Sequence, residues 1–354
     1  MKVRIENIYY LFCYAWDCLP ESRVVDVSGV PRPDTLNLFA HVIKMGTQHI
    51  LRRGLDRGYS VERAELQRLR GKIEFAASIS SLASSRISLV CEFEEFVPDV
   101  LHNQILRATI KRLALAEGVD PDLGAALRNI DLKLQGVRQI QLSGECFRRV
   151  QIHRNNAFYG FLMKVCELLY GAVLPDRGRN GRYLFREVLD DESYMSTVFE
   201  KFMRRFYELE QSEFPTVCNP TLNWDASSVR IRHLGFLPNM RTDAVLQSAN
   251  RLIIIDAKYY KDALQTYREK RTAHSGNLYQ LMSYLRSAKT QWPEKSCEGI
   301  LLYPVAASRI NLRYVINGHP LRVYTLDLSR RWPKVRKALL ALIRPSPSLP
   351  AHCQ

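Results

Sequence analysis

The spacing of apolar residues in the first half of the chain predicts helices on either side of a strand-rich segment. Residues 6–17 read as one short apolar helix, and residues 35–53 repeat apolar side chains at helical spacing. The second helix should end at Gly54, after the basic pair Arg52 and Arg53. The other expected elements are strands within 58–96, notably at 72–75 and 87–93, and helices at about 100–117, 120–135 and 155–172.

The second half of the chain has the order of elements typical of an α/β domain. A long helix is followed by several short strands, a second helix, further strands and a closing helix. This order predicts a central mixed sheet flanked by helices. The expected ranges are helices at about 192–213, 275–288 and 330–343, and strands near 216–223, 229–236, 241–247, 251–257, 298–304 and 311–326.

Length and composition divide the chain into two domains. A chain of 354 residues suits two domains of roughly 100–200 residues each. The basic, turn-rich stretch at 175–182 places the boundary within 150–182. We expect a mixed helix-and-strand (α+β) N-terminal domain at 1–160, an α/β domain at 161–344 and a frayed tail at 345–354.

Charge and cysteine usage narrow the class of protein. Lys plus Arg number 51 against 36 Asp plus Glu, which gives a net charge of +15. This excess favours a protein that binds a polyanion such as nucleic acid over a basic protein with no nucleic-acid role. No run of about 18 apolar residues predicts a membrane span, and the polar N-terminus does not resemble a signal peptide. The eight cysteines form no CxxC pair, so free thiols in the reducing cytoplasm are expected.

The strongest candidate chemistry lies in two carboxylates and a lysine. Asp243 opens one predicted strand, and the apolar run 252–255 ends in Asp256-Ala257-Lys258. Asp256 and Lys258 are two residues apart, so they share one side of an extended strand. The separation from Asp243 allows a hairpin that sets both carboxylates together, where a hard cation such as Mg²⁺ would relieve their repulsion. Such a cation can activate water for phosphodiester hydrolysis; the alternative is a simple ion pair at the end of a core strand.

Further residues could complete this site. Gln280 and Tyr284 share one helix face and could hold a phosphate or a backbone near the metal, or form an ordinary polar face. Glu200 could add a third carboxylate or simply pair with a nearby base. Basic residues after the site could bind phosphates or line a plain solvated loop; these are Lys261, Arg268, Lys270 and Arg271.

Other reaction classes lack their motifs. The chain contains no G-x-x-x-x-G-K-[S/T], so it should not bind a nucleotide through a P-loop of its own. It also contains no H-E-x-x-H and no G-x-S-x-G, and its eight histidines are dispersed.

Several sequence blocks in order resemble the McrC family, the nuclease subunits of the McrBC modification-dependent restriction systems. No single block is specific, but together they span nearly the whole chain. The blocks are Asn7-Ile8-Tyr9-Tyr10-Leu11, Tyr14-Ala15-Trp16, Gly71-Lys72-Ile73-Glu74-Phe75, Asn223-Trp224-Asp225-Ala226-Ser227-Ser228, Asp256-Ala257-Lys258-Tyr259-Tyr260, Asn277-Leu278-Tyr279-Gln280-Leu281 and Tyr303-Pro304.

The resemblance implies a C-terminal PD-(D/E)xK (restriction-endonuclease-like) domain that cuts double-stranded DNA carrying modified cytosine. Its catalytic residues carry over as Asp243, Asp256 and Lys258, and less firmly as Gln280 and Tyr284. The implied Mg²⁺ ligands are Asp243, Asp256 and Ala257, with Glu200 as a further candidate. The site departs from the superfamily pattern because Thr242, not proline, precedes Asp243.

The resemblance also implies an AAA+ GTPase ring as partner. In this family the N-terminal part docks into that ring and stimulates its GTPase, while the partner binds GTP and recognises the modified base. We expect the apolar opening segment and the strand-rich middle of the first domain to supply the docking surface, although single aromatics there could simply be core. Arginines between 52 and 86 are candidates for GTPase stimulation by charge alone.

Two other functions remain open at this point. The chain could be a non-catalytic regulator of a GTPase ring that keeps a relict nuclease fold, or a stand-alone RecB-like repair nuclease. The three intact residues Asp243, Asp256 and Lys258 argue against a relict. The large N-terminal domain without an enzymatic motif argues against a nuclease that works alone.

Overall fold

Two compact units make up the chain in the computed structural model, which describes residues 3–82, 88–175, 182–259, 264–267, 270–304 and 309–345. The helix-rich unit is Arg23–Arg186, and the sheet unit joins Met1–Ser22 to Glu187–Gln354. The units therefore differ from the expected domains, whose boundary lay at residue 160. The last helix before the break belongs to the first unit, and the first 22 residues belong to the second.

Four long helices pack together in the helix-rich unit. Helix α3 begins at an Asp34 cap, whose side chain accepts a hydrogen bond from the Asn37 amide, and ends at Gly54 with a positive φ of 92°. Gly46 of α3 faces Leu162 so closely that a β-carbon would clash, which lets α3 approach α8. The helices of the unit are α3 (Thr35–Arg53), α4 (Phe75–Leu82), α5 (Leu101–Ala114), α6 (Pro121–Lys133), α7 (Gly144–Arg149), η1 (Arg154–Asn156) and α8 (Ala157–Ala172).

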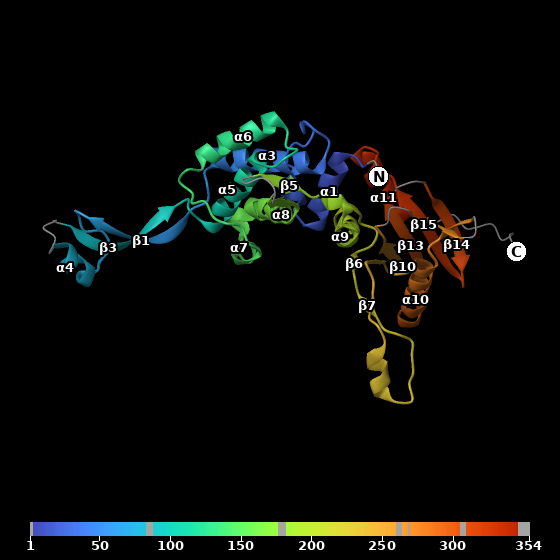
Figure 1. Cartoon of the computed structure of the whole chain (residues 1–354). Helices are drawn as coiled ribbons and strands as arrows, with labels where there is room; N and C mark the ends of the chain where they lie inside the picture. The colour runs from blue at the N-terminus through green and yellow to red at the C-terminus, as the bar shows by residue number, and fades with distance from the viewer. Residues whose placement is uncertain are drawn as a thin grey trace. The chain divides into compact units, whose positions relative to one another are not determined.

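A three-stranded antiparallel sheet extends from these helices in the order β1-β3-β2 (Figure 1). The expected strand at 72–75 is shorter than predicted, because Phe75 already begins helix α4. A buried polar network lies where this sheet begins: the Tyr159 hydroxyl donates to Asn103, and Asn103 donates to the Asp56 carbonyl. The strands of the unit are β1 (Gly58–Leu66), β2 (Lys72–Ile73), β3 (Leu89–Val97), β4 (Val173–Pro175) and β5 (Tyr183–Phe185).

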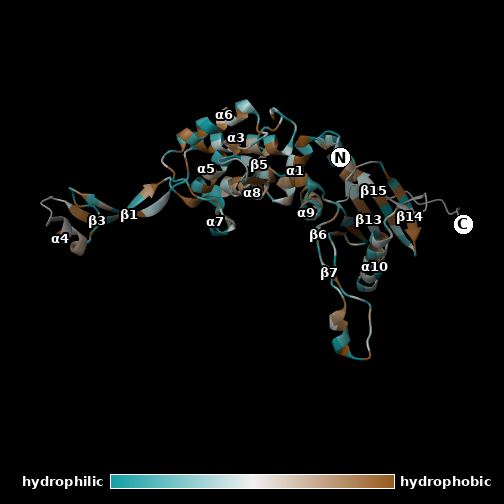
Figure 2. Ribbon diagram, viewed as in Figure 1, coloured by the Kyte–Doolittle hydropathy of each residue, from teal (hydrophilic) through white to brown (hydrophobic). Residues whose placement is uncertain are grey.

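The sheet unit has the predicted central mixed sheet, in the order β14-β15-β13-β10-β9-β6. Strand β10 pairs parallel with β13 and antiparallel with β9, and almost all of its residues are buried. Leu252 and Ile254 pack against helix α10, so strand alternation directs Ile253 and Ile255 to the face that α9 contacts. Hydrophobic colour runs along these central strands in Figure 2.

The bounds of the helices and strands in the sheet unit agree with most of the expected ranges. Its helices are α1 (Ile5–Ala15), α2 (Leu19–Ser22), η2 (Val188–Asp190), α9 (Glu192–Glu210), η3 (Ile231–Phe236), α10 (Ser275–Gln291) and α11 (Trp332–Leu342). Its strands are β6 (Thr216–Cys218), β7 (Thr221–Leu222), β8 (Met240–Arg241), β9 (Ala244–Gln247), β10 (Arg251–Ala257), β11 (Leu264–Tyr267), β12 (Lys270–Ala273), β13 (Ser296–Pro304), β14 (Asn311–Ile316) and β15 (His319–Leu326).

The strand expected at 229–236 was wrong. The apolar and basic residues alternate there as in a strand, but η3 forms instead through local hydrogen bonds, from the His233 amide to the Arg230 carbonyl and from Leu237 to Leu234. The alternation alone does not make a strand, because in the structure this segment pairs with no neighbouring strand.

Helix α1 is core of the sheet unit, which corrects the expectation that the apolar opening segment is a docking surface. Ile8, Phe12 and Tyr14 are at most 3% exposed. The Tyr14 ring packs against Phe202 of α9 and Trp332 of α11. The Asn7 amide joins the two ends of the chain by donating to the carbonyls of Leu328 and Arg330, both at 2.7 Å.

None of the helices in the described part of the chain combines the length and the apolar character needed to cross a bilayer.

Substituting Asn7 should destabilise the sheet unit. The Asn7→Ala change leaves the Arg330 carbonyl without this donor and the Leu328 carbonyl with the Arg4 main-chain amide alone, so we expect the free energy of unfolding to fall by about 2 kcal/mol. Urea denaturation followed by tryptophan fluorescence measures this, with the exposed Asn239→Ala as matched control. Equal midpoints for the two variants would contradict this role of Asn7.

Candidate active site

The three residues predicted from the sequence meet at the carboxyl end of β10. Ala244 pairs with Ile255 in the antiparallel β9–β10 hairpin, which brings Asp243 beside the end of β10. The Asp243 Oδ2 atom accepts a hydrogen bond from the Ala257 amide at 2.8 Å. Lys258 Nζ lies 3.0 Å from Asp256 Oδ1. The predicted hairpin and the shared side of Asp256 and Lys258 are both confirmed.

Burial dominates the electrostatics of the two carboxylates. The Asp256 side chain is only 1% exposed, and desolvation raises its pKa to about 7 against the opposing charge of Lys258. Burial also raises the pKa of Asp243, while Lys258 and the Ala257 amide act in the opposite direction. Each buried carboxylate therefore resists ionisation in the absence of a further cation.

One oxygen of Asp256 is left without a protein partner. Its Oδ1 atom contacts Lys258, but no hydrogen-bond partner for its buried Oδ2 atom exists among the described residues. A buried acceptor without a partner is costly, and a hard cation would satisfy it. This donor set of two carboxylates suits Mg²⁺, which commonly takes one or two carboxylates and completes its shell with water.

Glu200 of α9 lies near this pair without completing a three-carboxylate cluster. Burial raises the Glu200 pKa first, and the negative charge of Asp243 raises it further. Its Oε1 atom accepts a hydrogen bond from Ser196 at 3.4 Å. Within the described ranges, however, no three His, Cys, Asp or Glu side chains converge closely enough to hold a metal ion.

Gln280 and Tyr284 are brought to the site by α10, as their spacing predicts. The Gln280 amide donates to the Tyr284 hydroxyl at 2.8 Å, and that hydroxyl donates to the Arg241 carbonyl at 2.9 Å. Tyr284 therefore fixes the backbone two residues before Asp243. Gln280 is exposed, and Tyr284 is buried.

Two arginines near the site were not among the residues predicted from the sequence. The charges of Arg241 and Arg204 both lower the pKa of Asp243. Arg204 stands one helical turn after Glu200 on α9, and Arg241 stands two residues before Asp243, so the spacing held a signal for both. The other predicted basic residues yield no test: Lys261 and Arg268 lie outside the described residues, and for Lys270 and Arg271 of β12 only the backbone is described.

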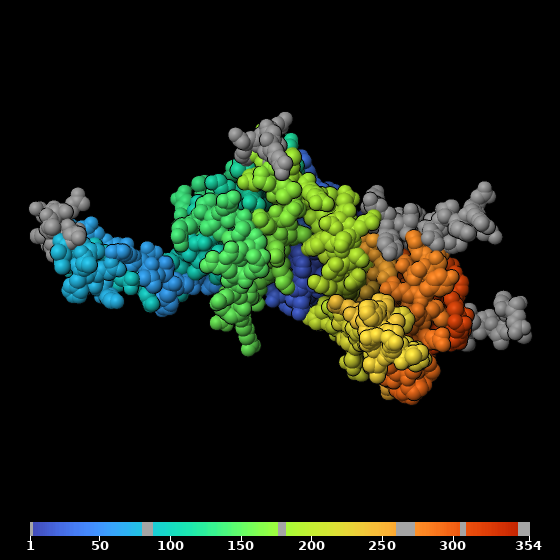
Figure 3. Space-filling view, turned by 60° about the horizontal axis from the view of Figure 1, so that its bottom comes forward, coloured from blue at the N-terminus to red at the C-terminus, as the bar shows by residue number. Residues whose placement is uncertain are grey.

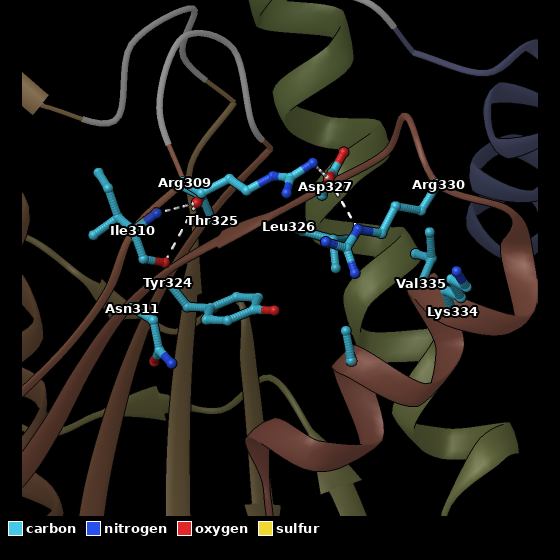
Figure 4. Close-up of a pocket in the computed structure, with 11 residues that line it drawn as sticks. Arg309, Ile310, Asn311, Tyr324, Thr325, Leu326, Asp327, Arg330, Lys334 and Val335 are labelled. Atoms are coloured by element: carbon cyan, nitrogen blue, oxygen red, sulfur yellow. Dashed lines mark hydrogen bonds and ion pairs between the residues drawn. The ribbon is translucent and has the colours of Figure 1, made fainter.

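A separate cavity of about 240 Å³ lies at the end of β15 and contains none of the predicted residues (Figure 4). Two of its cations, Arg309 and Arg330, share one carboxylate, at 2.6 and 3.1 Å from Asp327 Oδ2. None of the buried polar atoms that lack a partner in the described part of the chain lines this cavity. The β9–β10 hairpin therefore remains the best candidate for chemistry.

Comparison with known proteins shows what the whole chain is similar to. The family model of the McrBC 5-methylcytosine restriction system component matches residues 8–304. A protein of Escherichia coli (strain K12), described as the type IV methyl-directed restriction enzyme EcoKMcrBC, is 31% identical over 338 residues, covering 96% of each chain. A chain in the solved half-complex of Thermococcus gammatolerans McrB AAA+ hexamers with bound McrC has the same fold, with a TM-score of 0.61 and 18% identity, over 96% of this chain and 76% of that one.

The raised pKa of Asp256 predicts a pH-dependent stability penalty in metal-free protein. The unfolded carboxyl ionises above about pH 4, whereas the folded one ionises only near pH 7, so stability is lost as pH rises through this window. We expect Asp256→Asn to escape this loss. Its melting temperature in EDTA should therefore gain on that of the wild type between pH 4 and pH 8.

The exposed Glu294→Gln is the matched control and should track the wild type. A gap between Asp256→Asn and wild type that stays constant across this pH range would show that the carboxylate is not strained by burial.

Proposed function

The chain belongs to the family of McrBC 5-methylcytosine restriction system components, and on that premise we propose that it is the DNA-cleaving subunit of a modification-dependent restriction complex. Its reaction would be Mg²⁺-dependent hydrolysis of phosphodiester bonds in a PD-(D/E)xK site. The observation that carries the proposal is the pair of buried carboxylates, one with an unpartnered oxygen, beside a lysine at the end of β10.

Each site residue has a proposed role in this chemistry. Asp243 and Asp256 would hold Mg²⁺, with the main chain of Ala257 as a further contact and Glu200 acting through its charge. The bound metal would lower the pKa of a water molecule and stabilise negative charge on the phosphate. Lys258 would orient or deprotonate the attacking water. Tyr284 would act as a positioning residue, because its hydroxyl holds the Arg241 carbonyl next to Asp243.

We further propose an AAA+ GTPase ring as the partner. The chain has no P-loop, so a motor that depends on nucleotide must be another protein. The solved relative comes from an assembly of McrB AAA+ hexamers with bound McrC. In the helix-rich unit, the three-stranded sheet, its β1–β2 connection and α4 expose large apolar side chains that would suit such a partner; these are Tyr59, Val61, Leu69, Phe75, Ile79 and Phe96.

Separating cleavage from GTPase stimulation tests this function. We expect Asp256→Ala, assembled with the AAA+ protein of its own restriction system, to lose at least about a hundredfold in cleavage of methylated plasmid with Mg²⁺ and GTP. Stimulation of GTP hydrolysis in the same tubes should persist, because the docking surface lies in the other unit. The exposed Glu294→Ala serves as control and should keep both activities.

The outcomes separate the alternatives. A wild type that stimulates GTPase but never cuts DNA would be a regulator with a relict site. Equal cleavage by wild type and Asp256→Ala would place the active site elsewhere. Cleavage by the wild type without any partner would indicate a stand-alone nuclease.

The role of Tyr284 has its own matched test. Tyr284→Phe removes only the hydroxyl that donates to the Arg241 carbonyl, so we expect cleavage to fall roughly tenfold, as is common for groups that orient metal ligands. GTPase stimulation should not change. Tyr279→Phe on the same helix, where the side chain is exposed, should cut normally. Raising the Mg²⁺ concentration should partly rescue Tyr284→Phe, which a purely structural defect would not allow.

A further inference from the structure

A two-stranded arm leaves the sheet unit directly before Asp243. Thr221 pairs with Arg241 and Leu222 with Met240 at its base, and the loop between these strands carries η3 (Figure 1). We call residues 221–241 the site arm. Its base is fixed, because the Thr242 hydroxyl donates to the Pro220 carbonyl at 2.9 Å and the Trp224 indole donates to the Pro238 carbonyl at 2.6 Å.

The far part of the site arm exposes large apolar side chains. Val229 is fully exposed, and Ile231 and Phe236 are each 86% exposed. Single exposed apolar residues are ordinary, but three close together on one projecting segment indicate an interaction surface. The space-filling view shows this yellow segment as a continuous outer surface of the sheet unit (Figure 3).

Basic residues alternate with these apolar ones. Arg230 and Arg232 flank Ile231, and neither guanidinium forms an ion pair with any residue that the structure describes. With Arg241, the site arm has three arginines against the single carboxylate of Asp225. Hydrophilic and hydrophobic segments accordingly follow one another along the arm in Figure 2. Its charge fits a polyanion, and its apolar side chains fit a partner with apolar surfaces between the charges.

We propose that the site arm binds the DNA duplex beside the phosphate that is cut, which rests on the proposed nuclease function. Strand β8 runs into Asp243 within two residues, and Tyr284 holds the β8 backbone at Arg241. A duplex whose phosphate reaches the carboxylates therefore lies next to the base of the arm. Arg230 and Arg232 bind its phosphates, and Ile231 and Phe236 lie against sugars and base edges, as apolar wedges do in proteins that bind the minor groove.

The salt dependence of DNA binding tests the arginines. The full chain carrying Asp256→Ala, which prevents cutting, is titrated with a short duplex in EDTA at several KCl concentrations. Removing two phosphate contacts with Arg230→Gln and Arg232→Gln should weaken binding about tenfold at moderate salt. It should also lower the slope of log K against log salt by about 2.

A matched pair and an apolar pair make this test specific. Arg313→Gln with Lys337→Gln removes the same charge from exposed positions of the same unit and should leave the slope nearly unchanged. Ile231→Ser with Phe236→Ser should weaken binding without altering the slope, because no phosphate contact is lost. Thermal melting should be the same for all variants, since these arm side chains are exposed.

Three results would overturn the arm proposal. The first is an equal slope for the arginine pair and its matched pair. The second is a chain that fails to bind duplex even at low salt. The third is an arm variant that changes the sedimentation mass while DNA binding stays intact, which would make the arm a self-association surface. An unchanged slope together with normal cleavage by the wild-type complex refutes the arm and leaves the nuclease standing. A changed slope with no cleavage refutes the nuclease and leaves only DNA binding by the arm standing.

Discussion

Burying a carboxylate at the end of a hydrophobic strand is the constraint on which the rest of the sheet unit depends. Asp256 follows four fully buried apolar residues, so its charge is removed from water by the same packing that stabilises β10. A charge in such a place must be neutralised or paired. Lys258 supplies one partner at 3.0 Å, and the remaining oxygen lacks one among the described residues. Under the proposed function, a bound cation would supply the missing partner for this oxygen and stabilise the core.

The neighbouring elements position the groups around that carboxylate. The β9–β10 register fixes Asp243 through its hydrogen bond with the Ala257 amide, and α10 fixes the approach to Asp243 through Tyr284. Helix α9, which comes earlier in the sequence, adds the charge of Glu200. Each of these groups lies in a helix or strand or, for Asp243, one residue before β9, which suits chemistry that needs fixed distances.

The features on which the proposed functions rest lie in different units. The sheet unit contains the carboxylates and the site arm, and its own first helix is sealed into its core by Asn7 and the aromatic side chains around Tyr14. Among its described residues the helix-rich unit has no cluster of His, Cys, Asp or Glu that could hold a metal ion, but it carries a small sheet with exposed apolar side chains. This separation explains how DNA cleavage and contact with a motor protein could be altered independently.

The sequence by itself determined the order of elements and the central chemistry. Helical periodicity located α3, α5, α8 and α10 within a few residues, and the Asp243, Asp256 and Lys258 spacing placed three groups together, because a hairpin and strand alternation are local rules. Only the tertiary structure decided that α1 packs into the core of the sheet unit against α9 and α11, and that α8 belongs to the helix-rich unit. Those outcomes depend on which surfaces meet across hundreds of residues, and no local pattern of hydrophobic and polar positions contains that information.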